Sequence, residues 1–135
     1  LVYRTSAVGP FQRTDSRVSL HAPTEIPHPF WSRVHRLKQC TIPIDIDPKE
    51  IEKAQLHVVV WDGGRGSVEE YFTLNDHFLP VAGEGHHDTI YRVVDLDPDW
   101  LVQGDNTIKL LSDTEHHGIE ILLPGPAILV KKKNP

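Results

Sequence analysis

The chain uses one short phrase twice, DIDP at residues 45–48 and DLDP at residues 95–98. In each phrase the second aspartate can accept backbone N–H bonds as an N-cap, and the proline suits the first helical position, where no amide donor is missed. The apolar residue three positions after each proline, Ile51 or Leu101, can then anchor the turn in the core. Each phrase therefore predicts one capped helical turn.

Strand-like runs flank both turns. Residues 41–46 alternate apolar and polar side chains, as in a strand with one wet face, and Pro43 within them indicates an edge strand or a bulge. Residues 54–61 are apolar at nearly every position, which favours a central strand, and residues 106–111 form a third run. A strand, one capped turn and a new strand is how a chain crosses between the sheets of a β-sandwich.

The rest of the chain fits an all-β, antiparallel β-sandwich with only one-turn helices. About eight short strands separated by turn residues at regular spacing are typical of this class. We expect one domain, with residues 1–31 as an irregular entry segment containing one short strand near 17–21, and residues 32–132 as the sandwich. The predicted core consists of Ile44, Ile46, Leu56, Val58, Phe72, Leu74, Val94, Ile108, Leu110 and Ile121.

Composition narrows the possible partners. The chain has 135 residues, enough for one core, and no apolar run near the roughly 20 residues that span a bilayer. A net charge of −5 argues against nucleic acid as the main partner, because phosphate binding needs clustered cations and the only basic run is residues 131–133. The single cysteine, Cys40, is expected to be a buried free thiol. Because the chain starts at Leu1 and lacks methionine, we expect it to be excised from a longer protein.

Four stretches of the chain resemble the galactose-binding-domain-like jelly roll of carbohydrate-binding modules and of the sugar-binding domains of glycoside hydrolases. They are residues 54–62 (AQLHVVVWD), 72–76 (FTLND), 91–96 (YRVVDL) and 101–108 (LVQGDNTI), together under half of the chain. The family's hairpin usually has Asn-Gly where this chain has Asn-Asp, which is tolerable because aspartate adopts left-handed conformations. The resemblance implies sugar binding in loops at one end of the sandwich, and it alone suggests a structural calcium ion.

Histidine and carboxylate pairs offer alternative chemistry. The chain has nine histidines, including adjacent pairs at residues 86–87 and 116–117, but no spacing typical of a zinc site. Solvated loop histidines, sugar contacts and metal ligands stay open as roles for them. No two glutamates are fixed opposite one another as glycoside hydrolysis requires, and no G-x-S-x-G elbow or phosphate loop is present.

The candidate ligand site lies where loops 61–67, 82–88 and 112–118 could gather, because binding residues concentrate on loops held by a rigid scaffold. Trp61 would stack on the apolar face of a sugar, although burial in the core is the rival role for its indole. The polar groups expected to bind sugar hydroxyls are Asp62, Arg65, His86, His87, Asp113 and His116.

Three functional hypotheses follow from these patterns. The first is a non-catalytic carbohydrate-binding or accessory domain of a larger, secreted, carbohydrate-active protein, which can itself be a glycoside hydrolase. The second is a purely structural sandwich that packs against a catalytic neighbouring domain. The third is a small metal-dependent enzyme that uses the histidine loops. Binding of a glycan by the isolated chain separates the first from the second.

Overall fold

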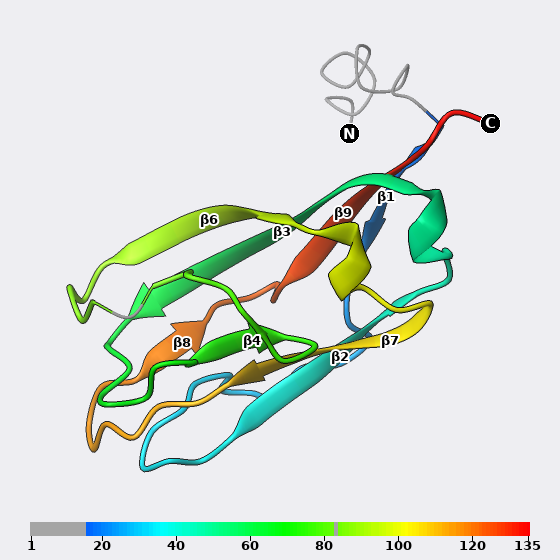
Figure 1. Cartoon of the computed structure of the whole chain (residues 1–135). Helices are drawn as coiled ribbons and strands as arrows, with labels where there is room; N and C mark the ends of the chain where they lie inside the picture. The colour runs from blue at the N-terminus through cyan, green and yellow to red at the C-terminus, as the bar shows by residue number, and fades with distance from the viewer. Residues whose placement is uncertain (1–15, 83) are drawn as a thin grey trace, which may run out of the picture.

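Two antiparallel sheets pack face to face in the computed structural model, which describes residues 16–82 and 84–135 (Figure 1). The first sheet has the order β1-β9-β3-β6, with β8 also paired to β3, and the second has the order β2-β7-β4-β5. The predicted all-β sandwich is confirmed. The strands are β1 (Val18–His21), β2 (Lys38–Ile44), β3 (Ile51–Asp62), β4 (Phe72–Leu74), β5 (His77–Phe78), β6 (Thr89–Leu96), β7 (Gly104–Leu110), β8 (Ile119–Ile121) and β9 (Ala127–Lys132).

The two repeated phrases form two of the crossings between the sheets. The 3-10 turn η1 (Pro48–Glu50) joins β2 to β3, and η2 (Pro98–Trp100) joins β6 to β7. In both turns the predicted cap, Asp47 or Asp97, accepts the backbone N–H two residues later at 2.9 Å. The apolar residue after each turn is only 3% exposed. The crossing inferred from the sequence is therefore confirmed at both places.

The core lies between the sheets and contains eight of the ten residues predicted for it. The other two, Ile46 and Val94, are half-buried and pack against its margin. Ile46 lies beyond the last paired residue of β2, and Val94 lies on β6, which has a neighbouring strand on one side only. Their position at the margin explains why the alternating pattern overestimated their burial.

Strand positions also follow the sequence pattern. β3 is the central strand of the first sheet, because β6 pairs along one side of it and β9 and β8 along the other. β2, which contains Pro43, is an edge strand of the second sheet. The tight hairpin between β4 and β5 turns at Asn75 and Asp76, whose φ angles of 48° and 68° are the left-handed values that such a turn needs.

The entry segment contributes one strand to the sandwich. The short strand expected near residues 17–21 is present as β1, and it pairs with β9. Residues 1–15 of the segment lie outside the described residues. Cys40 is 6% exposed, and burial raises the pKa of its thiol to about 11, as expected for a structural cysteine. In the part of the chain that the structure describes, we find no helix long and apolar enough to span a membrane.

Candidate functional site

The three loops singled out in the sequence meet at one end of the sandwich. Loop 61–67 contacts loop 82–88 through two backbone bonds, Asp62 N–H to Asp88 O at 2.9 Å and His87 N–H to Asp62 O at 2.8 Å. It contacts loop 112–118 through the hydroxyl of Ser112, which donates to Gly64 O at 3.3 Å. The strand register brings the loops together, since Trp61 near the end of β3 pairs with Thr89 on one side and Glu120 on the other.

Asp62 ties two of these loops together from inside. Its side chain is 0% exposed, and its carboxylate accepts the backbone N–H of Gly64 at 3.2 Å and of Glu84 at 3.1 Å. A buried carboxylate needs such donors, because removing it from water is otherwise costly. Asp62 therefore shapes the loop end, and it also lines the cavity described next.

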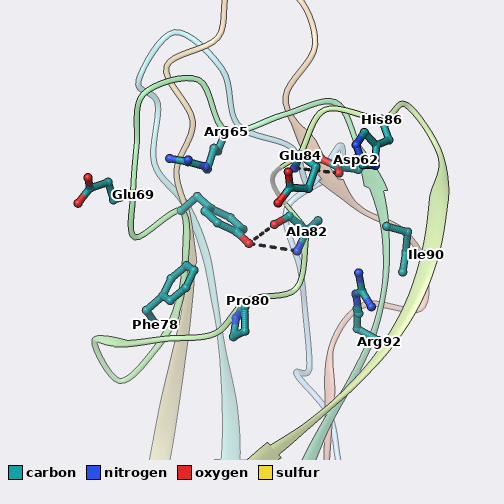
Figure 2. Close-up of a pocket in the computed structure, with 11 residues that line it drawn as sticks. Asp62, Arg65, Glu69, Phe78, Pro80, Ala82, Glu84, His86, Ile90 and Arg92 are labelled. Atoms are coloured by element: carbon teal, nitrogen blue, oxygen red, sulfur yellow. Dashed lines mark hydrogen bonds between the residues drawn. The ribbon is translucent and has the colours of Figure 1, made fainter.

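A cavity of about 560 Å³ opens at the side of the sandwich between β6 of the first sheet and β5 of the second (Figure 2). Both strands are edge strands, so the two sheets leave this side uncovered. Loop residues within 62–69, 80–82 and 84–86 line one end of the cavity. Its lining residues are Asp62, Arg65, Glu69, Tyr71, Phe78, Pro80, Ala82, Glu84, His86, Ile90 and Arg92.

Two aromatic rings form one wall of the cavity. Tyr71 is 4% exposed, and its hydroxyl donates to Ala82 O and accepts the Ala82 N–H at 3.2 Å. Burial raises the pKa of Tyr71, so its hydroxyl stays a donor at neutral pH. Phe78 lies edge-on to Tyr71, with ring centroids 5.1 Å apart, and is 38% exposed. The fixed tyrosine thus supports a phenyl ring that is open to a ligand.

Groups of both charges surround the rings. The guanidinium of Arg65 donates to Val68 O at 3.0 Å, and that of Arg92 donates to Val81 O at 2.9 Å. Each of these bonds uses one N–H and fixes the orientation of the group, which leaves further donors of the planar fork for a ligand. Carboxylates of Glu69 and Glu84 and the imidazole of His86 complete the polar lining. The cavity can therefore both donate and accept hydrogen bonds around an apolar surface.

Trp61 and His87 lie elsewhere, on the outer face of the first sheet. The His87 ring stacks on the indole with centroids 5.4 Å apart, and His117 approaches both rings edge-on. Successive residues of a strand point to opposite faces, so Trp61 points outward where Asp62 points inward. Trp61 and Asp62 are therefore adjacent in the sequence, but Trp61 lies on the outer face of the sheet and Asp62 lines the cavity.

Asp113 and His116 also lie outside the cavity. The carboxylate of Asp113 accepts bonds from the hydroxyl and the backbone N–H of Ser67, and these bonds lower its pKa. His116 is exposed, and its backbone carbonyl accepts a bond from Arg33 at 3.2 Å. Of the seven predicted ligand residues, the structure brings Asp62, Arg65 and His86 together around one cavity.

Metal ligation has no arrangement to support it among residues 16–82 and 84–135. No three His, Cys, Asp or Glu side chains of these ranges converge as ligands. The histidine pairs contribute instead to the ring cluster around Trp61, in which His87 and His117 contact one another with centroids 5.0 Å apart.

Tyr71, Phe78 and Arg92 are cavity residues that sequence reasoning missed. Two of them carry a signal that could have found them. Arg92 interrupts the apolar face that Ile90 and Val94 otherwise share, and Phe78 is a large apolar residue directly after a tight hairpin. A charge on an inward face and an aromatic on an exposed edge strand both depart from what packing alone requires.

Fold and cavity together define a two-sheet β-sandwich with a loop-bounded cavity at its open side. No family model matches the chain, and no curated protein matches it. The solved structures that share its fold include two proteins with GH86 in their names. One is BpGH86A, a β-porphyranase of glycoside hydrolase family 86 from the human gut bacterium Bacteroides plebeius, with a TM-score of 0.59 and 14% identity over 87% of this chain. The other is BuGH86wt in complex with neoagarooctaose, with a TM-score of 0.55 and 13% identity over 87% of this chain.

The match covers only a small part of each of these larger proteins. This chain spans 21% of the β-porphyranase and 19% of BuGH86wt. It therefore shares its fold with a part of each of these two proteins. At 13–14% identity the likeness concerns the fold.

Proposed function

We propose that this chain is a non-catalytic carbohydrate-binding domain of a larger, secreted, carbohydrate-active protein. The observation that carries the proposal is the exposed ring of Phe78 beside a cavity that contains two oriented guanidinium groups and three carboxylates. The resemblance to part of two family 86 enzymes supports the same class of protein.

The cavity has the chemistry that a sugar needs. The apolar face of a pyranose ring stacks on Phe78, while Arg65, Arg92 and Glu84 exchange hydrogen bonds with its hydroxyl groups. A volume of about 560 Å³ lies within the range of small-molecule sites. The affinity is expected to be modest, because each hydrogen bond to a sugar replaces one to water.

The ring cluster on the outer face is the competing platform. Trp61 is half-buried and one face of its indole is stacked on His87, but its position at the loop end keeps it a candidate for sugar stacking. His87, Asp113 and His116 would then supply the hydroxyl contacts expected from the sequence. The two platforms lie on different faces, so single substitutions distinguish them.

Titration calorimetry with neoagarooctaose, preceded by a glycan-array screen, tests the proposal. We expect Phe78→Ala to weaken glycan binding at least tenfold, and Arg92→Ala to weaken it by a similar factor through loss of charge-assisted bonds. Tyr91→Ala is the matched control, since Tyr91 is 62% exposed on the opposite face of the strand that holds Arg92. Weakening by Trp61→Ala with no effect of Phe78→Ala would overturn the cavity and assign the sugar to the ring cluster.

A second candidate function is the structural domain that packs against a neighbour. The outer face of the first sheet exposes large apolar side chains on its two edge strands, with Leu20 64% exposed and Val93 46% exposed. Exposed apolar patches mark interaction surfaces when they are contiguous. A folded domain that binds no glycan on the array would favour this candidate over carbohydrate binding.

A further inference from the structure

A second cavity, of about 470 Å³, lies at the other edge of the second sheet. It is lined by residues that include Trp31, Arg33, Arg36, Lys38 and Glu115, and Lys38 begins the edge strand β2. In the strand register, the start of β2 and the start of β4 both pair with the last residue of β7. The two cavities are therefore at the same end of the sandwich, on opposite edges of the second sheet.

The second cavity is basic within an acidic chain. It gathers Arg33, Arg36 and Lys38 around a single carboxylate, Glu115, whereas the whole chain carries a net charge of −5. Among the described residues, the ion pairs involve other cations, namely Arg17, Lys109 and Lys131. No carboxylate of the described ranges lies within ion-pair distance of the three cations of this cavity. Their charge is available to an anion.

Arg33 is held in position by two contacts. Its guanidinium lies over the indole of Trp31 at 3.8 Å from the ring centroid, and its Nη1 donates to His116 O at 3.2 Å. A guanidinium stacked on an aromatic face keeps its in-plane N–H donors free for a ligand. The indole thus presents a pre-oriented fork to the cavity.

The backbone between the two arginines is strained. Val34 and His35 have φ angles of 55° and 58°, a left-handed conformation that is unfavourable for a β-branched residue. Bonds from Val34 N–H to Thr114 O at 2.7 Å and from His35 N–H to Ser112 O at 2.8 Å fix the turn. Strain of this kind persists where the surroundings over-determine it, which is common at binding sites.

We propose that this second cavity, the Arg33 cavity, binds an oxyanion, either a carboxylate or a sulfate ester, carried on a saccharide. Planar guanidinium groups match the geometry of both anions, and the ammonium of Lys38 adds a point charge. The saccharide carrier rests on the proposed function, whereas the anion chemistry follows from the cavity itself. It is a different cavity from the one beside Phe78, so either proposal can fail alone.

Three dextrans with the same backbone test the proposal: neutral dextran, dextran sulfate and carboxymethyl dextran, each titrated into the intact chain at low and at high salt. We expect binding to at least one charged dextran, none to neutral dextran, and a loss of affinity as salt screens the cations. Arg36→Ala should weaken binding about tenfold, the scale of one charge-assisted contact. The preferred dextran tells which of the two anions the cavity takes.

Matched variants make the result specific to the Arg33 cavity. Removing two charges from the C-terminal basic run by Lys132→Ala and Lys133→Ala together should leave the affinity unchanged. Arg33→Lys keeps the charge but not the stacked fork, and we expect it to weaken binding severalfold. Unfolding temperatures verify that each variant is folded.

Three outcomes would overturn the proposal. They are an Arg36→Ala variant that binds charged dextran like the parent, a larger loss in the Lys132→Ala/Lys133→Ala variant, and equal binding of neutral dextran. If the chain bound a DNA duplex as tightly as charged dextran, the cavity would be a general polyanion site, and the proposal that the anion is carried on a saccharide would be wrong.

Discussion

Asp62 was expected from the sequence to bind a sugar hydroxyl, and its geometry predicts a mainly structural role instead. Its carboxylate is 0% exposed and accepts the backbone N–H groups of Gly64 and Glu84 at 3.2 and 3.1 Å. The bond to Glu84 joins loop 61–67 to loop 82–88, so it closes one end of the cavity beside Phe78. Substituting Asp62 should therefore destabilise the protein and open that cavity.

The magnitude follows from the two bonds. A hydrogen bond to a charged group contributes about 1.5–3 kcal/mol, so removing two would cost about 3–6 kcal/mol. The bond from the Gly64 N–H is buried, whereas the bond from the Glu84 N–H is only partly buried, so the Gly64 N–H bears the larger cost of losing its partner. The expected loss for Asp62→Ala is therefore near the lower end, about 3 kcal/mol. Asp62→Asn keeps one carbonyl oxygen and should lose about half as much.

Guanidinium denaturation of the parent, Asp62→Asn and Asp62→Ala measures these losses, and amide hydrogen exchange reports the two N–H groups directly. We expect faster exchange at Gly64 and Glu84 in Asp62→Ala. A loss under 1 kcal/mol with unchanged exchange would refute the structural role. An Asp62→Asn variant that keeps its stability but loses glycan binding would restore the ligand role expected from the sequence.

Two further predictions concern carboxylates at other places. Asp47→Ala and Asp97→Ala should each lose about 1 kcal/mol of stability as a cap is removed, measured by denaturation, and neither should alter glycan binding. A change in affinity at constant melting temperature would show that one of these turns belongs to a binding site. The bonds from Ser67 hold the pKa of Asp113 below its ordinary value. The ionised carboxylate therefore stabilises the folded protein at pH values above the unfolded-state pKa of about 3.9. This stabilisation is lost as the pH falls through the lower folded-state pKa. The difference in melting temperature between the parent and Asp113→Asn should therefore be largest near neutral pH and should disappear in acid. A difference of constant size down to pH 2 would contradict the stabilising role of the Asp113 carboxylate.

The fold was largely predictable because its determinants are local. Each capped turn depends on an aspartate, a proline and one apolar residue within five positions, so a short sequence motif is enough to identify it. Alternation then assigns the inward face of each strand. Among the predicted core residues, alternation overestimated burial only at Ile46 and Val94. Both lie at the margin of a sheet, and alternation does not encode where that margin is.

The site was less predictable because it depends on which sheet edges are left open. The loops gathered as the turn residues implied, yet neighbours such as Trp61 and Asp62 went to different faces. Tyr71, Phe78 and Arg92 come together only because β5 and β6 are both edge strands. Strand order is a long-range property, and no spacing within the sequence specifies it.

The two cavities are connected by a buried chain of hydrogen bonds. These bonds make the loop end rigid, because the single cysteine of the chain can form no disulfide within it. Asp62 accepts the N–H of Gly64, Gly64 O accepts the hydroxyl of Ser112, and Ser112 N–H donates to the hydroxyl of Ser32 at 2.8 Å. That hydroxyl in turn donates to Arg36 O at 2.5 Å. Asp62, Ser32 and Ser112 are each 0% exposed, so leaving any of these groups unpaired would be costly. Both cavities thus keep their shape without a ligand, and a ligand that enters either one has less ordering entropy to overcome.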